Sequence, residues 1–178
     1  RQGNRLLTLV TQLLDISKVK SVIGEPNWQH GNICAQVAML LETYIDYAAN
    51  RGVTLKYHYD QAIEMDFVPD YVNKVMSNLV SNALKFTPNG GTISVNLYQR
   101  GDRLHIDVSD TGHGISSDKL AHIFEPFYTT GDMGEAKGTG IGLALTQEII
   151  SHLNGTITAE SQVGKGTTFH IVMPIQNR

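Results

Sequence analysis

The chain has 178 residues, 41% of them hydrophobic and 17% charged, with a net charge of −3. This length indicates one domain with an appendage, and the apolar share excludes a disordered chain. The absence of a long basic run disfavours a nucleic-acid partner. Cys34, the single cysteine, excludes an internal disulfide and a four-cysteine zinc site and is typical of a reducing compartment.

Residues 5–19 are predicted to form a helix, because apolar residues recur three or four positions apart. Such a stripe is typical of a helix that packs against a partner helix. The chain starts within this pattern, so we expect it to be a piece of a longer protein. Gly24 and Pro26 then interrupt the periodicity. We therefore divide the chain into a helix at 1–20, a linker at 21–31 and a domain at 32–178.

The remaining sequence mixes helical and strand periodicity. Asp70 is the expected start signal of one helix, and Gly101-Asp102 is the expected turn of a hairpin. Hairpins imply antiparallel pairing, so we predict an α+β two-layer sandwich with the helices on one face of the sheet. The predicted helices are 33–49, 71–86, 116–124 and 143–153, and the predicted strands are 53–59, 92–98, 103–109, 156–160 and 167–173.

Seven of the 17 glycines lie between Gly112 and Gly142. They indicate either a flexible loop or a backbone that must approach a ligand closely. Their spacing matches neither the P-loop nor the dinucleotide-binding fingerprint. The run from Gly138 leads directly into a predicted helix, whose free N–H groups would favour an anion such as a phosphate. A glycine loop that merely enters a helix is the alternative.

Two further features carry polar groups that could bind a ligand. At about 100° per residue, Asn78, Asn82 and Lys85 share one face of the predicted helix at 71–86. This face could hold a magnesium ion and contact phosphates, or it could be an ordinary solvated face. Asp110 ends a strand and could accept a hydrogen bond from an exocyclic amine such as that of adenine. It could equally belong to an Asp-x-Gly turn.

Five short motifs occur in a recognisable order, namely NLVSNALKFTP at 78–88, DTGHGI at 110–115, FEPFYTT at 124–130, GTGIGL at 138–143 and GKGTTF at 164–169. In this order they resemble the N, G1, F and G2 boxes and the last glycine motif of sensor histidine kinases. The resemblance covers about 32–176. It implies the Bergerat ATP-binding fold shared by gyrase, heat-shock chaperones, histidine kinases and mismatch-repair proteins. Residues 4–18 resemble the second helix of the dimerisation and phosphotransfer hairpin, which forms a four-helix bundle across a dimer.

The resemblance implies a role for individual residues. Asp110 would accept from the adenine amino group, in a pocket shaped by Gly112 and Gly114 and lined by Ile115. Asn82 would coordinate magnesium with help from Asn78, Lys85 would contact phosphate, and Phe86 would pack near the base. Asn78, Asn82 and Lys85 are thus the implied catalytic residues. The other implied ATP-binding residues are Phe124, Phe127, Gly138, Thr139, Gly140, Gly142, Leu143 and Thr167.

The resemblance also implies a reaction. ATP-hydrolysing relatives place a glutamate four residues before the magnesium-binding asparagine, but this chain has Asn78 there, and an amide cannot act as the base. The implied reaction is phosphoryl transfer from magnesium-ATP to a histidine and then to a response-regulator aspartate. None of the seven histidines is followed by an acidic residue, as the family's phosphoacceptor is. We therefore expect the acceptor on a helix outside this chain, and little activity from the chain alone.

The resemblance further implies a homodimer for the intact protein and a cytoplasmic location for this domain. It leaves open whether the intact protein is anchored in a membrane, and it assigns no role to His113. Two alternative functions remain. One is a non-catalytic nucleotide-sensing module that changes the dimer geometry of a partner. The other is an anti-sigma-type serine kinase of the same fold, against which the helix resemblance at 4–18 counts.

Overall fold

The computed structural model describes residues 26–126 and 142–175. The predicted helix at 5–19 lies outside the described residues. No helix among the described residues is both long and apolar enough to cross a lipid bilayer. The elements in chain order are β1 (Gln29–Asn32), α3 (Ile33–Asn50), β2 (Thr54–Tyr59), β3 (Glu64–Phe67), α4 (Pro69–Phe86), β4 (Thr92–Arg100), β5 (Arg103–Asp110), α5 (Ser117–Leu120), α6 (Gly142–His152), β6 (Thr156–Gln162) and β7 (Gly166–Pro174).

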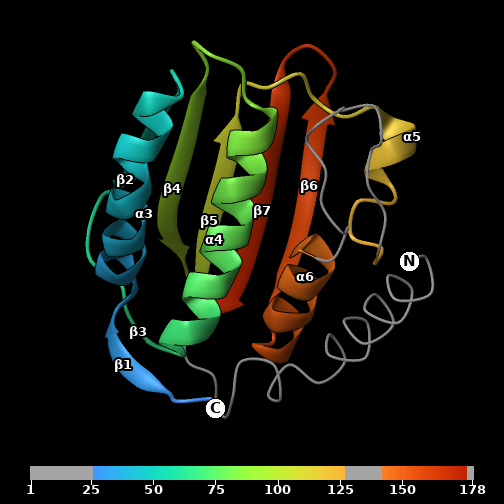
Figure 1. The fold of residues 1–178 in the computed structure, drawn as a ribbon. Coiled ribbons are helices and arrows are strands. Elements are labelled where there is room, and N and C mark those ends of the chain that lie inside the picture. Colours follow the sequence, from blue (N-terminus) through green and yellow to red (C-terminus); the bar gives the residue numbers. More distant parts are fainter. Residues whose placement is uncertain (1–25, 127–141, 176–178) are drawn as a thin grey trace, which may run out of the picture.

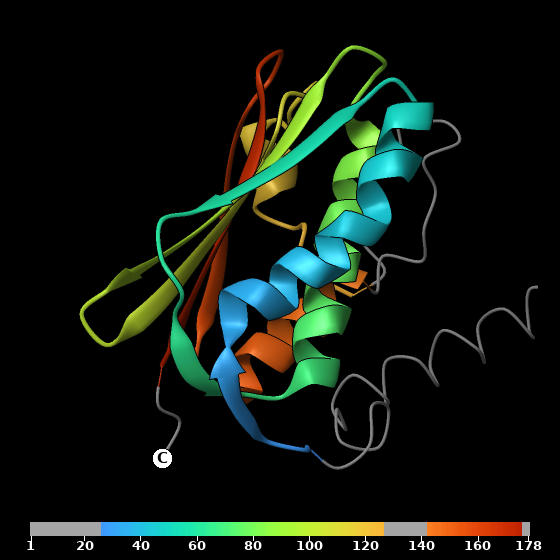
Figure 2. The same ribbon diagram turned by 90° about the vertical axis from the view of Figure 1, so that its left-hand side faces the viewer.

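Three helices and a five-stranded sheet form two layers (Figure 1). The strand order is β2-β4-β5-β7-β6. Helices α3, α4 and α6 all lie on one face of this sheet, as the view turned by 90° makes clear (Figure 2). The predicted α+β two-layer sandwich is therefore confirmed.

One strand pair differs from the expected antiparallel arrangement. β2 and β4 run parallel, whereas β4–β5, β5–β7 and β6–β7 are antiparallel. The reason is that α4 lies between β2 and β4 in the chain. A crossover of this kind returns the chain to the same end of the sheet, so that the next strand points the same way.

The core lies between the sheet and the helices. Alternate residues of the three central strands are buried there, namely Ile93, Val95, Leu97, Leu104, Ile106, Val108, Phe169, Ile171 and Met173. The helices contribute fully buried side chains from their inner faces, among them Leu41, Met76, Leu79, Ile149 and Ile150. Each such side chain stabilises the fold by about 1.5–3 kcal/mol. This packing fixes α4 over the sheet and determines which of its faces is left for polar residues.

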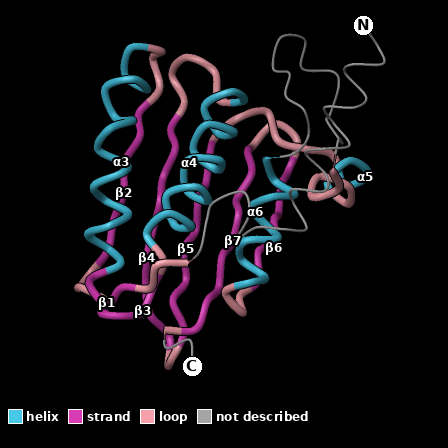
Figure 3. Tube along the Cα trace, turned by 60° about the horizontal axis from the view of Figure 1, so that its bottom comes forward, coloured by secondary structure: helices cyan, strands magenta, loops and turns pink. Residues whose placement is uncertain are grey.

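A small second sheet begins within the segment 21–31 that was predicted as a linker. β1 pairs antiparallel with β3, with Gln29 opposite Phe67 (Figure 3). The Asn32 side chain then caps α3, because its Oδ1 accepts from the Cys34 N–H at 3.0 Å. Residues 29–31 therefore belong to the folded unit. The sequence did not indicate this pair because each strand has only four residues and its partner lies over 30 residues away.

Helix α4 begins earlier than predicted and without the expected cap. Its N-cap residue is Val68, which makes no side-chain capping hydrogen bond, and Pro69 occupies the first turn. Proline needs no partner there because it has no N–H. Asp70 lies inside the first turn, where the helix dipole favours a negative charge.

A polar network crosses the face of the sheet opposite the helices. The two ring nitrogens of His170 lie 2.7 Å from Asp107 Oδ1 and 2.6 Å from Glu160 Oε2. Tyr98 donates to the other oxygen of Asp107 at 3.2 Å. Two carboxylate partners require both ring nitrogens to carry protons. Burial opposes the charged form, but the hydrogen bonds and charges of Asp107 and Glu160 outweigh it and raise the pKa of His170.

We expect His170→Gln to lower the free energy of unfolding by an amount that depends on pH. Because the native pKa is raised, the charged ring stabilises the fold fully below the unfolded value of about 6.5. This contribution is lost as the pH rises through the native pKa. Urea unfolding at several pH values should show the difference between variant and wild type shrinking as the pH rises. His58→Gln is the control, because its contact with Asp60 is exposed on both sides. A pH-independent difference for His170→Gln would contradict the assignment.

Candidate functional site

The polar face predicted for α4 is present, and its three members reach different places. Asn78 and Asn82 are half-buried and Lys85 is exposed, whereas the neighbouring Val75 and Leu79 are buried in the core. Asn78 contacts α6, Asn82 lines a narrow cavity, and Lys85 lines a wider one. One face of α4 therefore borders the start of α6, the narrow cavity and the wider cavity.

Asn78 is tied to the start of α6. Its Nδ2 donates to the Thr146 hydroxyl at 3.1 Å and to the Gly142 carbonyl at 3.3 Å. Thr146 is fully buried and its hydroxyl donates to the same carbonyl at 2.9 Å. With Nδ2 engaged, the amide oxygen of Asn78 is the atom left for another ligand. The sequence pattern did not reveal Thr146, because nothing in it shows that α6 packs beside α4.

The narrow cavity brings together six predicted residues from four segments. Its lining comprises Asn82, Phe86, Asp110, His113, Gly114, Ile115 and Thr167. Only His113 in this set had no predicted role. The cavity volume is about 20 Å³, which is close to the space of a single water site. A ring of purine size therefore requires the wall to open, and the side chains of Phe86 and His113 form part of that wall.

Asp110 lies at the end of β5 and lines this cavity. Its Oδ1 accepts from the Gly112 N–H at 2.9 Å, and its cross-strand partner is Thr167 on β7. Burial raises the pKa of Asp110, against the opposing effect of the N–H groups of Gly112 and Thr167. A carboxylate can accept about four hydrogen bonds, so beyond these two N–H groups the half-buried Asp110 can still accept from an amine donor on a ligand.

Two glycines in the loop after β5 allow a close approach of backbones. A Cβ on Gly112 would lie 2.5 Å from the Phe86 carbonyl oxygen, at the end of α4. A Cβ on Gly114 would lie 2.2 Å from the Gln162 carbonyl oxygen, and its φ of +78° is rarely adopted by other residues. At these positions, the glycines serve to pack the loop against α4 and β6.

A serine that the sequence analysis missed holds the loop on its other side. Ser161 Oγ accepts from the Ile115 N–H at 2.7 Å and donates to the Gly166 carbonyl at 2.9 Å. The Thr167 hydroxyl lies 2.8 Å from Ser161 Oγ. In β6, Ser161 shares the inward-facing register of Ile157 and Ala159, but it lies just beyond the strand predicted at 156–160, so only the fold identifies it.

The remaining predicted residues lie near the gap in the described chain. Phe124 packs edge-to-face on Phe169, with ring centroids 6.1 Å apart. Leu143 is half-buried against the core, and Gly142 is exposed at the first position of α6. The other predicted members fall outside the described residues, namely Phe127, Gly138, Thr139 and Gly140.

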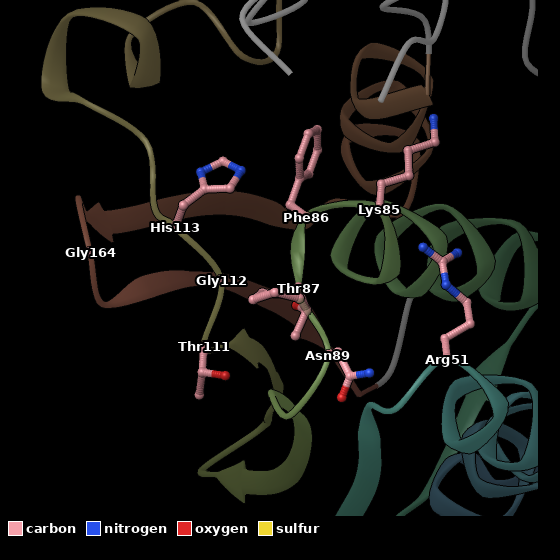
Figure 4. Close-up of a pocket in the computed structure, with 10 residues that line it drawn as sticks. Arg51, Lys85, Phe86, Thr87, Asn89, Thr111, Gly112, His113 and Gly164 are labelled. Carbon is pink, nitrogen blue, oxygen red and sulfur yellow. The ribbon is translucent and has the colours of Figure 1, made fainter. Parts of the chain in front are cut away.

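The wider cavity lies at the end of α4 and has a volume of about 850 Å³ (Figure 4). It is lined by Arg51, Lys85, Phe86, Thr87, Pro88, Asn89, Thr111, Gly112, His113 and Gly164. Phe86 and His113 line both cavities and contact each other edge-to-face at 5.6 Å between ring centroids. The pair is thus a wall common to the two spaces.

The described residues contain no group of three or more His, Cys, Asp or Glu side chains suited to a metal ion. A cation at this site would therefore depend on amide oxygens, which Asn82 and Asn78 supply, and on oxygens of the ligand itself. Magnesium accepts such a set, because it retains water and phosphate ligands and needs few from the protein.

Comparison with known families identifies the domain. A family model described as "Histidine kinase-, DNA gyrase B-, and HSP90-like ATPase" matches residues 68–177, a range that holds every residue of the narrow cavity. The chain belongs to this ATPase family. Within the family, the sequence is that of the catalytic domain of a two-component sensor histidine kinase.

Curated relatives of this ATPase domain include sensor kinases. The chain is 35% identical to the autoinducer 2 sensor kinase/phosphatase LuxQ of Vibrio parahaemolyticus, over 99% of this chain and 22% of that protein. It is 33% identical to the sensor histidine kinase RppB of Synechocystis, over 98% of this chain and 39% of that protein. It is 32% identical to the sensor histidine kinase ZraS of Escherichia coli, over 98% of this chain and 36% of that protein. The chain thus spans well under half the length of each of these relatives.

Solved structures share the fold of the ATPase domain. The catalytic domain of the histidine kinase ThkA superposes with a TM-score of 0.76 at 22% identity, over 85% of this chain and 97% of that one. Full-length ShkA in complex with AMPPNP superposes with a TM-score of 0.81 at 23% identity, over 99% of this chain and 37% of that one. The two-layer arrangement described above is therefore the fold of histidine kinase catalytic domains.

Proposed function

We propose that this domain binds magnesium-ATP and transfers the γ-phosphoryl group to a histidine outside residues 1–178, for relay to a response-regulator aspartate. The observation that carries the proposal is the narrow cavity, where Asp110, Asn82 and Thr167 meet although they lie on three separate elements. The sensor kinase relatives support the same reaction class.

In this proposal, each side chain has a distinct role. Asp110 accepts a hydrogen bond from the adenine amine, and the aromatic ring of Phe86 lies against the base. The amide oxygens of Asn82 and Asn78 hold magnesium, and the Lys85 ammonium neutralises phosphate charge. Magnesium, when bound, would reduce the negative charge that builds up on the transferring group. The protein's part is positioning and electrostatic stabilisation.

The surroundings of Asn78 support transfer rather than hydrolysis. Activation of water requires a base that can take a proton. Asn78 occupies the position of the hydrolytic glutamate, and its Nδ2 donates to Thr146 and Gly142. An amide in this state orients α6 and offers an oxygen, but it accepts no proton at neutral pH. The phosphoryl acceptor must then be a side chain presented from elsewhere.

The same proposal includes the phosphoacceptor histidine and the protein partners of the intact kinase. The histidine would be carried by the first helix of a dimerisation hairpin, of which residues 4–18 resemble the second helix. Two copies of the protein would form the helical bundle, and a receiver domain would dock there. The domain would face the cytoplasm, where ATP and receivers are present.

Asp110→Ala is expected to weaken ATP binding by about 10-fold or more, because a hydrogen bond to a charged group contributes about 1.5–3 kcal/mol. Binding of GTP, which has a carbonyl where adenine has its amine, should change much less. Calorimetric titration with both nucleotides measures the contrast. Asp118→Ala, at an exposed position of α5, is the matched control. Unchanged ATP affinity in Asp110→Ala would rule out the adenine assignment.

Asn82→Ala is expected to lower nucleotide affinity mainly when magnesium is present. The lost amide oxygen would be a ligand of the ion, so titrations of ATP in magnesium should show a fall of about 10-fold. Titrations in a chelator should show a smaller change. Ser81→Ala, on the exposed side of the same helical turn, controls for effects on α4. An equal loss with and without the ion would assign Asn82 to the nucleotide alone.

The reaction itself can be tested on the longer parent protein with radiolabelled ATP. We expect acid-labile label on the protein, which is characteristic of phosphohistidine, and its loss when Lys85 is replaced by Ala. Tight ATP binding without any label would favour the nucleotide-sensing alternative. Acid-stable label on a separate protein would favour the serine kinase.

A further inference from the structure

The wider cavity is larger than the proposed adenine cavity and is lined by basic residues. Its volume of about 850 Å³ lies within the range of small-molecule sites, about 300–1,000 Å³. Arg51, Lys85 and His113 line it, and none of its lining residues within the described ranges is an aspartate or a glutamate. Figure 4 shows Phe86 and His113 at one side of the cavity and Lys85 and Arg51 at the other.

The charge of this cavity stands out against the rest of the chain. The protein carries a net charge of −3, whereas the described part of this lining holds basic groups and no carboxylate, which focuses positive potential locally. Arg51 follows α3, and its guanidinium lies 3.3 Å from the Tyr47 hydroxyl and 5.8 Å from the centre of the Tyr47 ring. Among the described residues, the ion pairs do not include Arg51.

A buried polar group at the same place lacks a partner. Thr87 lines the cavity and is 5% exposed, yet its hydroxyl has no hydrogen-bond partner among the described residues. Buried hydroxyls normally have a partner, but this oxygen has almost no accessible surface, so a ligand atom in the open cavity does not reach it. Asn89 and Thr111 add an amide and a second hydroxyl to the lining.

We propose that this cavity is a second binding site, which accepts an oxyanion of two or more negative charges and up to nucleotide size. The guanidinium of Arg51 and the ammonium of Lys85 bind its charged oxygens, and the exposed Asn89 amide and Thr111 hydroxyl offer neutral donors. Arg51 suits this task because its planar donors match a phosphate or a carboxylate group.

The site would act on the proposed nucleotide site, and this part rests on the proposed function. Phe86 and His113 line both cavities, and the narrow one must open at that wall to admit a purine. An anion that contacts His113 from the wider cavity changes the position of the wall. The two ligands would therefore alter each other's affinity by the same factor.

Inorganic pyrophosphate is a suitable probe for the anion site. Calorimetric titration in metal-free buffer, with the chain saturated with AMPPNP, should show one pyrophosphate bound per chain. Arg51→Gln should weaken this binding by about 10-fold, and Arg51→Lys should retain most of it. AMPPNP affinity should be unchanged in Arg51→Gln when no pyrophosphate is present. Lys56→Gln, on β2 and outside the cavity, is the control for net charge.

Three results would overturn the proposal. One is equal pyrophosphate affinity in wild type and a folded Arg51→Gln. Another is complete displacement of pyrophosphate by AMPPNP, which would make the cavity the phosphate end of the nucleotide site. The third is an equal loss in Lys56→Gln, which would indicate unspecific charge attraction. Failure of the nucleotide site would look different, because Asp110→Ala should lose AMPPNP and keep pyrophosphate.

Discussion

The close contact between the end of α4 and the loop after β5 is the constraint on which the candidate site depends. Gly112 lies against the Phe86 carbonyl, and Gly114 lies against the Gln162 carbonyl. Because neither position has room for a side chain, the loop fits between a helix and a strand. This contact places the Asp110 carboxylate next to Asn82, although the two residues belong to different layers. The polar groups are thus brought together by backbone packing.

The hydrophobic pattern carried enough information to predict the layers but not the pairing of every strand. The inner faces of α3, α4 and α6 and the alternation in β4, β5 and β7 are periodic signals, and the structure follows them. The pair β1–β3 and the parallel pair β2–β4 were missed. Pairing depends on which segments meet in space, and a four-residue strand leaves no periodicity from which to infer that.

The site was predictable where chemistry and local pattern coincide. Asn78, Asn82 and Lys85 could be assigned to one helical face because helical geometry is regular, and Asp110 stood out at a strand end before glycines. Thr146 and Ser161 could not be found in this way. Their hydroxyls matter because α6 and β6 bring them to Asn78 and to Ile115, and those neighbours are set by the tertiary fold. Asp70 is not the cap because the helix begins at Pro69, which places Asp70 inside the first turn.

Helix α4 connects the two cavities, and this shapes how the domain could respond to ligands. Its buried face is fixed in the core, so the helix itself is a rigid reference. Its last turn and the following residue supply Lys85, Phe86 and Thr87 to the wider cavity, while Asn82 and Phe86 face the narrow one. Phe86 is therefore the element of α4 that touches both spaces, and it is only half-buried. A rigid helix with one adjustable aromatic side chain at its end can couple two ligands without any rearrangement of the sheet.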